Sequence, residues 1–586
     1  MNRLDFESDV LVIGGGFGGA VAALRAAELG QSVTLVEKAV VSRAGPSTYV
    51  HSQYAPDKKV EGEELEAWMD EFVVGANYMA DQDWVEQYIL EAYDRTQEMI
   101  KLGVPYAKDA EGNLRYVSVR GHKLGTTLGV DGRACMEVLR RRMKAKRVKL
   151  VEKVAVIELL TSDNKYPTNG SIVGAVGVHI RTGQPHVFKA KSVILNSGPF
   201  YPKIHYAFGD HCTGEIHAAA WRAGAEFAGM EFATFAAWSN FNNKFFTPGQ
   251  AKIQGVGAHF KNASGERFME KYDPIWGELS GLFQIARAII TENIEGRGPC
   301  YLDLRHVSEE DIKVLYEVSP SVERAFNEFK IDPSKDTLEL GPFVVIGTLS
   351  SSGPNIGLNA ETSIPGLYAT GYGTSCPHLM SGISGSGIST FSMVGGHRAA
   401  EHAKKRSDEL QIPSINEGRV DEILTAYFKP MKKLRQVRSS DIWMEIGEIT
   451  STAEFALFKT EKRIKHVINQ LKTLREERIP KIFAPDMHEL EKAHEVKNYL
   501  DMAILACFAM LERTESRGEL FRVDYPYQDN DNWLKWLLVK KVDGEEDPVF
   551  THHDLNYDKW RIKPPTGRLP SPYPVPERYA EENNND

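Results

Sequence analysis

Three glycines and one acidic residue near the start of the chain have the spacing of a dinucleotide-binding turn. Gly14, Gly16 and Gly19 fit the pattern G-x-G-x-x-G. In this pattern the first glycine permits a tight turn, the second lets backbone amides approach a pyrophosphate, and the third lets a helix pack closely on a strand. Glu37 follows 23 residues after Gly14, close to the spacing of about 20 expected for a carboxylate that binds ribose hydroxyls. The chemistry that these residues predict is the binding of a dinucleotide.

The sequence around these residues predicts the elements that must position them. An apolar strand at residues 10–13 leads into the glycines, and a helix over residues 20–30 follows them and ends at Gly30. A second strand at residues 33–36 stops directly before Glu37. The N-terminus of such a helix offers free N–H groups and the positive end of its dipole to phosphates. The agreement of all four parts favours a βαβ nucleotide-binding unit over a glycine-rich turn in another kind of α/β protein.

Length and composition limit the class of protein. With 586 residues the chain is too long for one core, so we expect roughly two to four domains. A formal charge of −10 gives no electrostatic footprint for nucleic acid. The chain has no run of about 18 apolar residues, so no integral membrane segment is expected. The few residues before the first strand leave no room for a hydrophobic signal segment, which predicts a cytoplasmic protein.

The cysteines predict neither a disulfide framework nor a metal site. Their number is odd, and no two of them have the C-x-x-C spacing. An iron–sulfur centre would therefore have to lie on another polypeptide. The five residues are Cys135, Cys212, Cys300, Cys376 and Cys507.

Periodic patterns predict the elements of the first half of the chain. Two amphipathic helices are expected between residues 61 and 102, and another helix over 132–143. Strands are expected at 154–160, 172–180 and 187–195.

The second half shows a change of pattern and then a return to helices. The glycine and aromatic pattern between residues 232 and 341 predicts an inserted domain. Helical periodicity extends from 416 to 514 and places Cys507 on an apolar face, where a core role is favoured over a reactive one. The segment after Lys563 is rich in proline and charge, which predicts an extended or disordered tail.

Seven separated segments resemble the flavoprotein subunits of the fumarate reductase/succinate dehydrogenase family, and the related adenylylsulfate reductase α subunit. They are the N-terminal fingerprint that ends at Glu37-Lys38, and residues 190–198, 212–232, 265–274, 295–306, 364–371 and 515–535. The resemblance covers roughly residues 8–540. The segment 346–353, the turn at Arg43-Ala-Gly and the segment from Pro377 favour the adenylylsulfate reductase branch.

The resemblance implies an α/β fold with a Rossmann-like FAD-binding domain, an inserted α+β capping domain and a C-terminal helical domain. The domains that we expect are 1–232 (FAD-binding, first part), 233–341 (capping), 342–410 (FAD-binding, second part), 411–540 (helical) and 541–586 (extended tail).

The resemblance also implies bound FAD, which we expect to be noncovalent. Some members of the family attach FAD through a histidine, and Gly45 stands at that position here. His51 leaves open a shifted attachment. The residues that the resemblance places at the cofactor are Gly14, Gly16, Phe17, Gly18, Gly19, Glu37, Lys38, Arg43, Ala44, Gly45, Val154, Ser197, Gly198, Thr213, Glu215, Gly371, Tyr372, Ser384 and Ile388.

The positions that bind a dicarboxylate in fumarate reductases carry different residues in this chain. The two histidines fall on Ala236 and near Leu349, and the clamping arginine on Gly382. The catalytic arginine falls on Leu282, although Arg287 lies five residues further on. Because a bidentate arginine is the group best suited to a carboxylate, this pattern disfavours fumarate or succinate as the substrate.

Two residues remain as catalytic candidates, His378 and Arg287. His378 could transfer a proton near neutral pH, or it could be a histidine whose nitrogens are satisfied by backbone contacts. Arg287, His211, His217 and His259 are second-rank candidates, for which a structural role is favoured.

These features support three hypotheses about function. The first is an FAD-dependent oxidoreductase that desaturates or reduces a C–C bond of a small organic substrate other than fumarate or succinate. The second is a flavin subunit, similar to that of adenylylsulfate reductase, that exchanges electrons with a small iron–sulfur protein. The third is an electron-transfer or assembly subunit whose own substrate site has decayed. The sequence leaves homo-oligomerisation open.

Overall fold

The computed structural model describes most of the chain. The described residues are 2–50, 52–118, 124, 126–204, 211–240, 250–348, 351–380, 387–570 and 579.

A seven-stranded sheet carries the glycine turn at the end of one of its central strands. From edge to edge it contains β6 (Lys149–Glu152), β2 (Val33–Glu37), β1 (Leu4–Ile13), β9 (Pro185–Leu195), β8 (Ile172–His179) and β7 (Val154–Thr161), and β16 (Leu367–Ala369) also pairs with β9. Strands β6, β2, β1, β9 and β16 run parallel, whereas β8 and β7 are antiparallel additions. The predicted parallel nucleotide-binding sheet is confirmed.

Three helices lie beside this sheet, where two of them pack on the first and bury apolar side chains against it. They are α1 (Phe17–Glu28), α4 (Gly132–Ala145) and α11 (Gly387–Asp408). A Cβ atom on Gly396 would lie 2.5 Å from the carbonyl oxygen of Gly18, so glycine is required where α11 crosses α1. The helix predicted after the glycines is therefore α1, which begins three residues earlier than expected.

A helical pair and a small sheet cover one end of α11. The helices are α2 (Gly62–Gly75) and α3 (Gln82–Leu102), and the sheet joins β3 (Ser52–Tyr54), β5 (Thr126–Gly129) and β4 (Tyr116–Ser118). The carboxylate of Asp81 caps α3 by accepting hydrogen bonds from the N–H groups of Asp83 and Trp84. The two helices expected between residues 61 and 102 are present.

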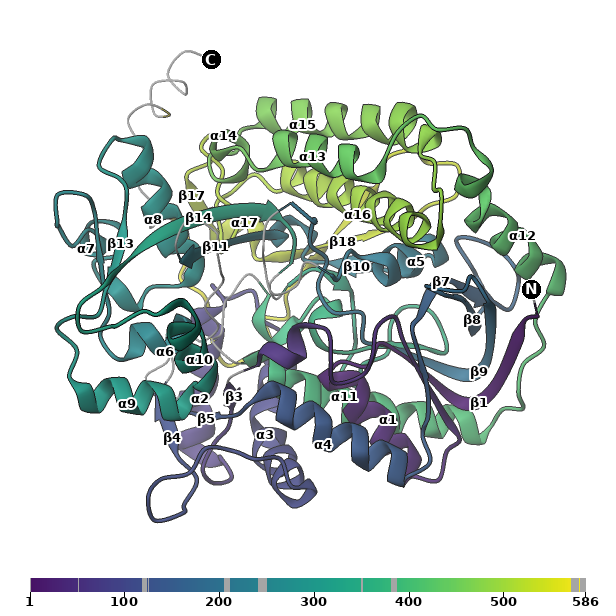
Figure 1. Cartoon of the computed structure of the whole chain (residues 1–586), viewed down its shortest axis with the longest axis horizontal. Coiled ribbons are helices and arrows are strands. Elements are labelled where there is room, and N and C mark those ends of the chain that lie inside the picture. Colours follow the sequence, from purple (N-terminus) through teal and green to yellow (C-terminus); the bar gives the residue numbers. More distant parts are fainter. Residues whose placement is uncertain are drawn as a thin grey trace.

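The segment 233–341, called the cap below, lies on the left in Figure 1. Its antiparallel sheet contains β11 (Thr234–Asn240), β14 (Thr337–Ile346), β13 (Tyr301–Asp303) and β12 (His259–Lys261). Its helices are α6 (Gln250–Gly255), α7 (Met269–Tyr272), α8 (Leu282–Ile294), α9 (Glu309–Val318) and α10 (Pro320–Phe329).

The helical domain follows, along the top of Figure 1. It contains α12 (Glu417–Tyr427), α13 (Ser439–Thr450), α14 (Ala453–Ala456), α15 (Glu461–Thr473) and α16 (Met487–Glu512). Helix α16 contacts α5 (Glu215–Ala223) of the FAD-binding part. Cys507 lies in α16 and is buried, as its apolar face predicts.

The last described part of the chain contains more strands than the sequence predicts. Strands β18 (Lys535–Lys540) and β19 (Val549–Asp554) join β10 (Phe227–Ala228) and β15 (Gly353–Pro354) in one sheet. The same part of the chain also contains a two-stranded sheet and a short helix. They are β17 (Tyr527–Asp529), which pairs with β20 (Arg568–Pro570), and α17 (Asn530–Trp533). Strands β18 and β19, in segments expected to be helical or an extended tail, therefore form a sheet with two strands of the FAD-binding part. The predicted domain boundaries stay a prediction.

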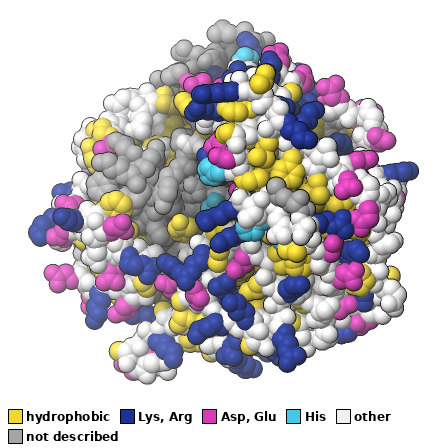
Figure 2. Space-filling view, turned by 45° about the vertical axis from the view of Figure 1, so that its right-hand side comes forward, with side chains coloured by type: hydrophobic (Ala, Val, Ile, Leu, Met, Phe, Trp, Pro, Cys, Tyr) yellow, Lys and Arg dark blue, Asp and Glu magenta, His cyan; other side chains and the backbone are white. Residues whose placement is uncertain are grey.

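No helix in the described part of the chain is both long and apolar enough to cross a membrane. On the face shown in Figure 2, lysine and arginine side chains are interspersed with aspartate and glutamate side chains.

A buried ionic network fixes the end of α16 to the rest of the protein. The carboxylate of Glu515 accepts hydrogen bonds from Arg513 (2.7 Å) and from two nitrogens of Arg517 (2.7 and 2.8 Å). Arg513 also pairs with Glu231, from the FAD-binding part, at 2.8 Å. All four side chains are almost completely shielded from solvent.

Replacing Glu515 with alanine should lower the free energy of unfolding by about 3–5 kcal/mol, because the buried guanidinium of Arg517 loses its counter-charge and Arg513 keeps only Glu231. Urea denaturation of Glu515→Ala measures this loss. The exposed Glu448 provides the control, since Glu448→Ala should change stability by less than about 0.5 kcal/mol. Equal stabilities of the two variants would show that the network contributes little.

Candidate functional site

The glycine turn between β1 and α1 has a geometry that side chains would prevent. Gly14 has a φ of +100°, and a Cβ atom there would lie 2.1 Å from the carbonyl oxygen of Asn196. A Cβ atom on Gly19 would lie 2.1 Å from the carbonyl oxygen of Gly14. The turn can therefore lie against the end of β9 only with glycine at both positions.

Glu37 at the end of β2 supports this turn from the side. One carboxylate oxygen accepts a hydrogen bond from the N–H of Gly15 at 2.7 Å, and the other accepts one from the N–H of Ala39 at 2.9 Å. Each oxygen keeps a further lone pair for a ligand. The side chain is thus fixed where the spacing predicts a ribose-binding acid.

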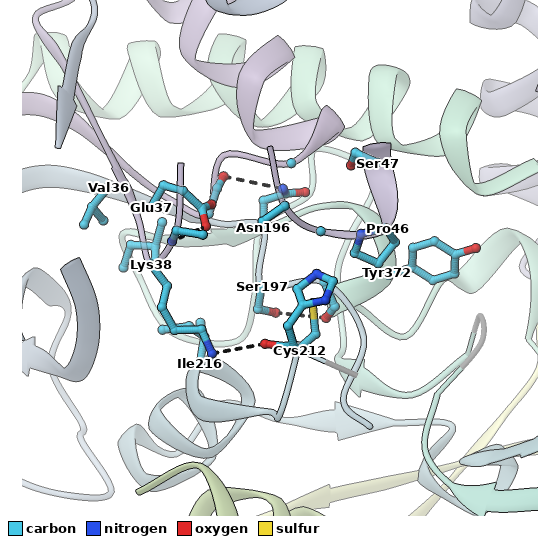
Figure 3. Close-up of a pocket in the computed structure, with 18 of the residues that line it drawn as sticks. Val36, Glu37, Lys38, Pro46, Ser47, Asn196, Ser197, Cys212, Ile216 and Tyr372 are labelled. Atoms are coloured by element: carbon cyan, nitrogen blue, oxygen red, sulfur yellow. Dashed lines mark hydrogen bonds between the residues drawn. The ribbon is translucent and has the colours of Figure 1, made fainter. Parts of the chain in front are cut away.

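A cleft opens along the carboxyl ends of β1, β2 and β9, and Figure 3 shows most of its lining. Glu37 and Lys38 lie on one side of it and Tyr372 on the other, with Asn196 and Ser197 between them. The lining residues are Ile13, Gly14, Gly16, Phe17, Gly18, Val36, Glu37, Lys38, Ala39, Ala44, Gly45, Pro46, Ser47, Val154, Ala155, Val156, Asn196, Ser197, Gly198, His211, Cys212, Glu215, Ile216, Tyr372 and Ser392.

The ammonium of Lys38 joins three segments at one end of this cleft. It lies 2.5 Å from a carboxylate oxygen of Glu215 and 3.0 Å from one of Glu495, and it donates a hydrogen bond to the carbonyl oxygen of His211 at 3.1 Å. Burial alone would lower the pKa of Lys38, but the charges of Glu215, Glu495 and Glu491 outweigh it and raise that pKa well above its usual value. The ammonium stays charged and holds the cleft to α16.

Glu495 is the buried counter-charge in this cluster. Burial would raise the pKa of Glu495, but Lys38 and Lys203 lower it to about 2, and Lys203 lies 2.5 Å from its second oxygen. Burial raises the pKa of Glu491 to about 7. The attraction of Lys38 opposes this shift, and the repulsion of Glu495 and Glu215 adds to it. The cluster therefore contains one carboxyl group that gains or loses its proton near neutral pH.

The residues present fit FAD. In the first turn of α1 the N–H groups of Gly18 and Gly19 have no acceptor within the helix, as phosphate binding requires. The hydroxyl of Thr213 is fully buried and has no hydrogen-bond partner in the described part of the chain. Thr213 itself does not line the cleft, but its neighbour Cys212 does. Glycine backbone, ribose-binding acid and unpaired donors together suit a dinucleotide.

Most of the predicted cofactor residues line the cleft. They are Gly14, Gly16, Phe17, Gly18, Glu37, Lys38, Ala44, Gly45, Val154, Ser197, Gly198, Glu215 and Tyr372.

Six predicted residues do not line the cleft as described. Gly19 packs against the backbone of Gly14, and Gly371 packs against the side chain of Asn196. Thr213 and Ile388 are buried. Arg43 points elsewhere and pairs with Glu137 at 2.9 Å. Ser384 lies outside the described residues, as do His51 and the positions 349 and 382.

The cleft contains lining residues that the sequence did not single out. Asn196 directly precedes the predicted Ser197, and its side-chain amide donates to the carbonyl oxygen of Gly14 at 3.4 Å. Ser47 accepts a hydrogen bond from the N–H of Phe17 at 2.9 Å. Both could have been found from their places beside predicted motifs. His211, a second-rank candidate, lines the cleft, and its Nε2 lies 3.9 Å from the position of a Cβ atom on Gly45.

His378 is enclosed by aromatic rings and is not among the residues that line the cleft. Its ring stacks on Phe391 at 4.1 Å between centroids and lies 4.8 Å from Tyr88. The side chain is fully buried, and neither ring nitrogen has a hydrogen-bond partner among the residues that the structure describes. Burial lowers the pKa of His378 to about 3, so the imidazole is neutral at pH 7.

Arg287 lies in α8 at the contact between the cap and the helical domain. Its guanidinium lies 3.8 Å from the ring centroid of Phe521 and 5.6 Å from that of Phe458. The side chain is 3% exposed. A cation held over aromatic rings in this way contributes to packing between the two parts of the chain.

The other histidine candidates have structural contacts. His217 is buried beside Phe200, and burial lowers its pKa to about 4. His259 stacks on His306 at 3.7 Å within the cap. Within the described ranges, no group of three or more His, Cys, Asp or Glu residues could hold a metal ion.

Comparison with protein families matches two parts of the chain. Residues 9–388 match the family model of the FAD binding domain, and residues 445–568 match that of the fumarate reductase flavoprotein C-terminal region. This chain belongs to the fumarate reductase/succinate dehydrogenase flavoprotein family. It is an FAD-dependent oxidoreductase, as the resemblance of its motifs predicts.

Relatives and solved structures of this family match along most of their length. A fumarate reductase (CoM/CoB) chain from Methanothermobacter marburgensis is 26% identical, over 92% of this chain and 97% of its own. The succinate dehydrogenase flavoprotein of Rickettsia felis is 25% identical, over 92% of this chain and 93% of its own. A quinol fumarate reductase structure from E. coli superposes with a TM-score of 0.83 and 20% identity, covering 96% of this chain and 99% of that one. The structure of adenylylsulfate reductase from Archaeoglobus fulgidus superposes with a TM-score of 0.78 and 22% identity, covering 96% of this chain and 98% of that one.

Replacing Glu37 with alanine should weaken FAD binding about tenfold to a hundredfold. The change removes the acceptor for the N–H groups of Gly15 and Ala39 and a charged group for the ligand, and hydrogen bonds to charged groups contribute about 1.5–3 kcal/mol. FAD retained after repeated ultrafiltration measures the effect. Glu28→Ala, at an exposed position of α1, is the matched control. Equal retention in both variants would contradict the role of Glu37.

Glu491 should make stability depend on pH. Its pKa is about 7 in the folded protein and near 4.5 without the fold, so its contribution is fully present below about pH 4.5 and is lost as the pH rises through 7. In urea denaturation from pH 5 to 8.5, Glu491→Gln should lose less stability than the parent. Parallel profiles would show that Glu491 is not the titrating group, and the exposed Glu448→Gln should follow the parent.

Proposed function

We propose that this flavoprotein desaturates a C–C single bond, or reduces a C=C bond, of an organic substrate that is not fumarate or succinate. It uses noncovalently bound FAD. FAD, when bound, supplies two-electron chemistry. Two electrons and two protons added to a C=C bond give the saturated product, and the reverse gives the desaturated one.

The observation that carries this proposal is the apolar character of the positions that correspond to dicarboxylate-binding residues. Ala236 is 2% exposed and belongs to a cluster with Phe283, Ala286 and Val344. Leu282 is 6% exposed within the core of the cap. Arg287 lies over Phe521 and Phe458 of the same cluster, where aromatic rings already hold its guanidinium. The two positions themselves offer a carboxylate only apolar side chains, which is unfavourable. An uncharged substrate is compatible with this environment.

His378 supports a carbonyl group next to the reacting bond. A neutral imidazole with an N–H group can donate a hydrogen bond to a carbonyl oxygen and stabilise negative charge that develops on it. Leaving both ring nitrogens of His378 unpaired while buried is unfavourable by about 1–3 kcal/mol for each lost partner. A substrate carbonyl would recover part of this energy. The low pKa of His378 argues against transfer of a proton from an imidazolium near neutral pH.

Gly45 supports noncovalent attachment of FAD. The position that carries the attachment histidine in some relatives has no side chain here, and its φ of +87° suits glycine. Flavin that stays with the chain after denaturation would contradict this part of the proposal.

A second candidate is an electron-transferring flavin subunit with an iron–sulfur partner. The similarity to adenylylsulfate reductase structures, with TM-scores of 0.79 and 0.78, favours it. The cysteines cannot supply the cluster, because all five are free and separated in the structure. The iron–sulfur centre would then belong to another protein.

Anaerobic reoxidation of the reduced flavin tests the proposal. We expect protein purified with any bound partner to show a flavin spectrum without iron, and its reduced flavin to be reoxidised by 2-cyclohexen-1-one and not by fumarate. In His378→Ala the flavin should be retained and kcat should fall by about tenfold or more. The cap variant His259→Ala should keep the kcat of the parent. Reoxidation by fumarate would contradict the proposal, and iron absorbance with a small cysteine-rich partner would favour the second candidate.

A further inference from the structure

A second pocket lies on the other side of the loop that lines the FAD cleft. Residues 44–47 line the cleft, whereas Ser42, Arg43 and residues 48–50 line the second pocket. Its other walls are residues 130–133 at the start of α4, and residues 320, 321 and 324 of α10 in the cap. Its volume is about 320 Å³, which is within the range of small-molecule sites. One loop therefore separates this pocket from the cofactor site.

Three guanidinium groups give this pocket positive charge. Arg43 and Arg324 are each held by one carboxylate, Glu137 at 2.9 Å and Asp131 at 3.2 Å. Arg133 has no ion pair within the described residues, and Asp131 is the one acid in the lining. With Glu137 and Asp131 counted against the three arginines, the pocket keeps an excess of one positive charge. Guanidinium groups with free N–H donors bind phosphate oxygens with favourable geometry.

The N-terminus of α10 adds unpaired donors to the same pocket. Ser319 stands at the N-cap, beside the lining and not in it; it makes no capping hydrogen bond, and its hydroxyl is fully buried without a partner among the described residues. The hydroxyl of Ser321, in the lining, is also shielded and unpaired in the described structure. Helices normally satisfy such N-terminal groups with a side-chain cap or an anion. Pro320 has no N–H, and the N–H of Val322 donates to the carbonyl oxygen of Ser319 at 2.9 Å. The N–H and hydroxyl of Ser321 therefore remain for an anion at this helix end.

The pocket lies where the cap meets the FAD-binding part. A Cβ atom on Gly129 of β5 would lie 2.9 Å from the carbonyl oxygen of Val318, immediately before α10. The two parts of the chain are therefore in close backbone contact beside the pocket. A ligand held by Arg43 and Arg133 on one side and by α10 on the other would connect them.

We propose that this pocket binds the phosphate group of a small organic anion and thereby ties the cap to the loop that lines the FAD cleft. The phosphate oxygens accept hydrogen bonds from Arg133, from the remaining N–H groups of Arg43 and Arg324, and from Ser321. The organic part occupies the rest of the volume. This site is separate from the diphosphate-binding turn at Gly14.

Calorimetric titration of the FAD-saturated protein with inorganic phosphate at low ionic strength tests the proposal. FAD saturation keeps phosphate out of the cofactor site, and chloride at matched ionic strength measures non-specific anion binding. We expect saturable binding of phosphate with a stoichiometry of one, and no saturable binding of chloride. Arg133→Ala should weaken phosphate binding about tenfold or more, because it removes charge-assisted hydrogen bonds. Arg141→Ala, an exposed arginine of the same helix, should bind phosphate as the parent does.

A second variant separates ligand binding from a structural role. Ser321→Ala removes an unpaired hydroxyl, so the thermal stability of the phosphate-free protein should be unchanged or higher. Its affinity for phosphate should nevertheless fall severalfold. Absence of saturable phosphate binding, or equal affinities of Arg133→Ala and Arg141→Ala, would overturn the proposal. Loss of stability in phosphate-free Ser321→Ala without loss of affinity would overturn the assignment of that hydroxyl.

Discussion

The partly buried ammonium of Lys38 is the charge on which the arrangement of the cofactor cleft depends. It lies between Glu215, which lines the cleft, and Glu495 of α16. Because Glu495 is almost completely buried, separating it from the ammonium would leave an uncompensated charge inside the protein, which is strongly unfavourable. These ion pairs therefore join the FAD cleft to the helical domain, although the two come from distant parts of the chain.

The same kind of interaction fixes the other end of α16. Arg513 pairs with Glu231 and with Glu515 in a region closed to solvent. The cap is attached differently, because apolar side chains and the guanidinium of Arg287 over Phe521 make its described contacts with the helical domain. Apolar contacts are much less directional than buried ion pairs. Directional ion pairs thus fix the helical domain to the FAD-binding part, whereas less directional contacts set the position of the cap relative to the helical domain.

The sequence predicts the parts of the site that are built from neighbouring residues. Gly14, Gly19 and Glu37 lie within one βαβ unit, so their spacing alone indicates their role. The contact of Asn196 with Gly14 joins residues that are 182 positions apart, and that of Lys38 with Glu495 joins residues 457 apart. No spacing rule predicts such pairs. Strand β19 was missed for a similar reason, because five of its six residues are exposed and it shows no alternation of apolar side chains.

His378 shows how tertiary structure changes the meaning of a residue that sequence can only propose. From sequence, a histidine in this segment is either a proton-transfer group or a ring satisfied by the backbone. In the structure its described surroundings are the rings of Tyr88 and Phe391, which offer its nitrogens no strong acceptor and lower its pKa. Such an imidazole has too low a pKa to supply protons at neutral pH, but it keeps one N–H group that nothing in the described structure uses. Among the buried polar groups without a partner in the described part of the chain, His378, Thr213 and Ser321 are the ones that a ligand could satisfy in the sites considered above.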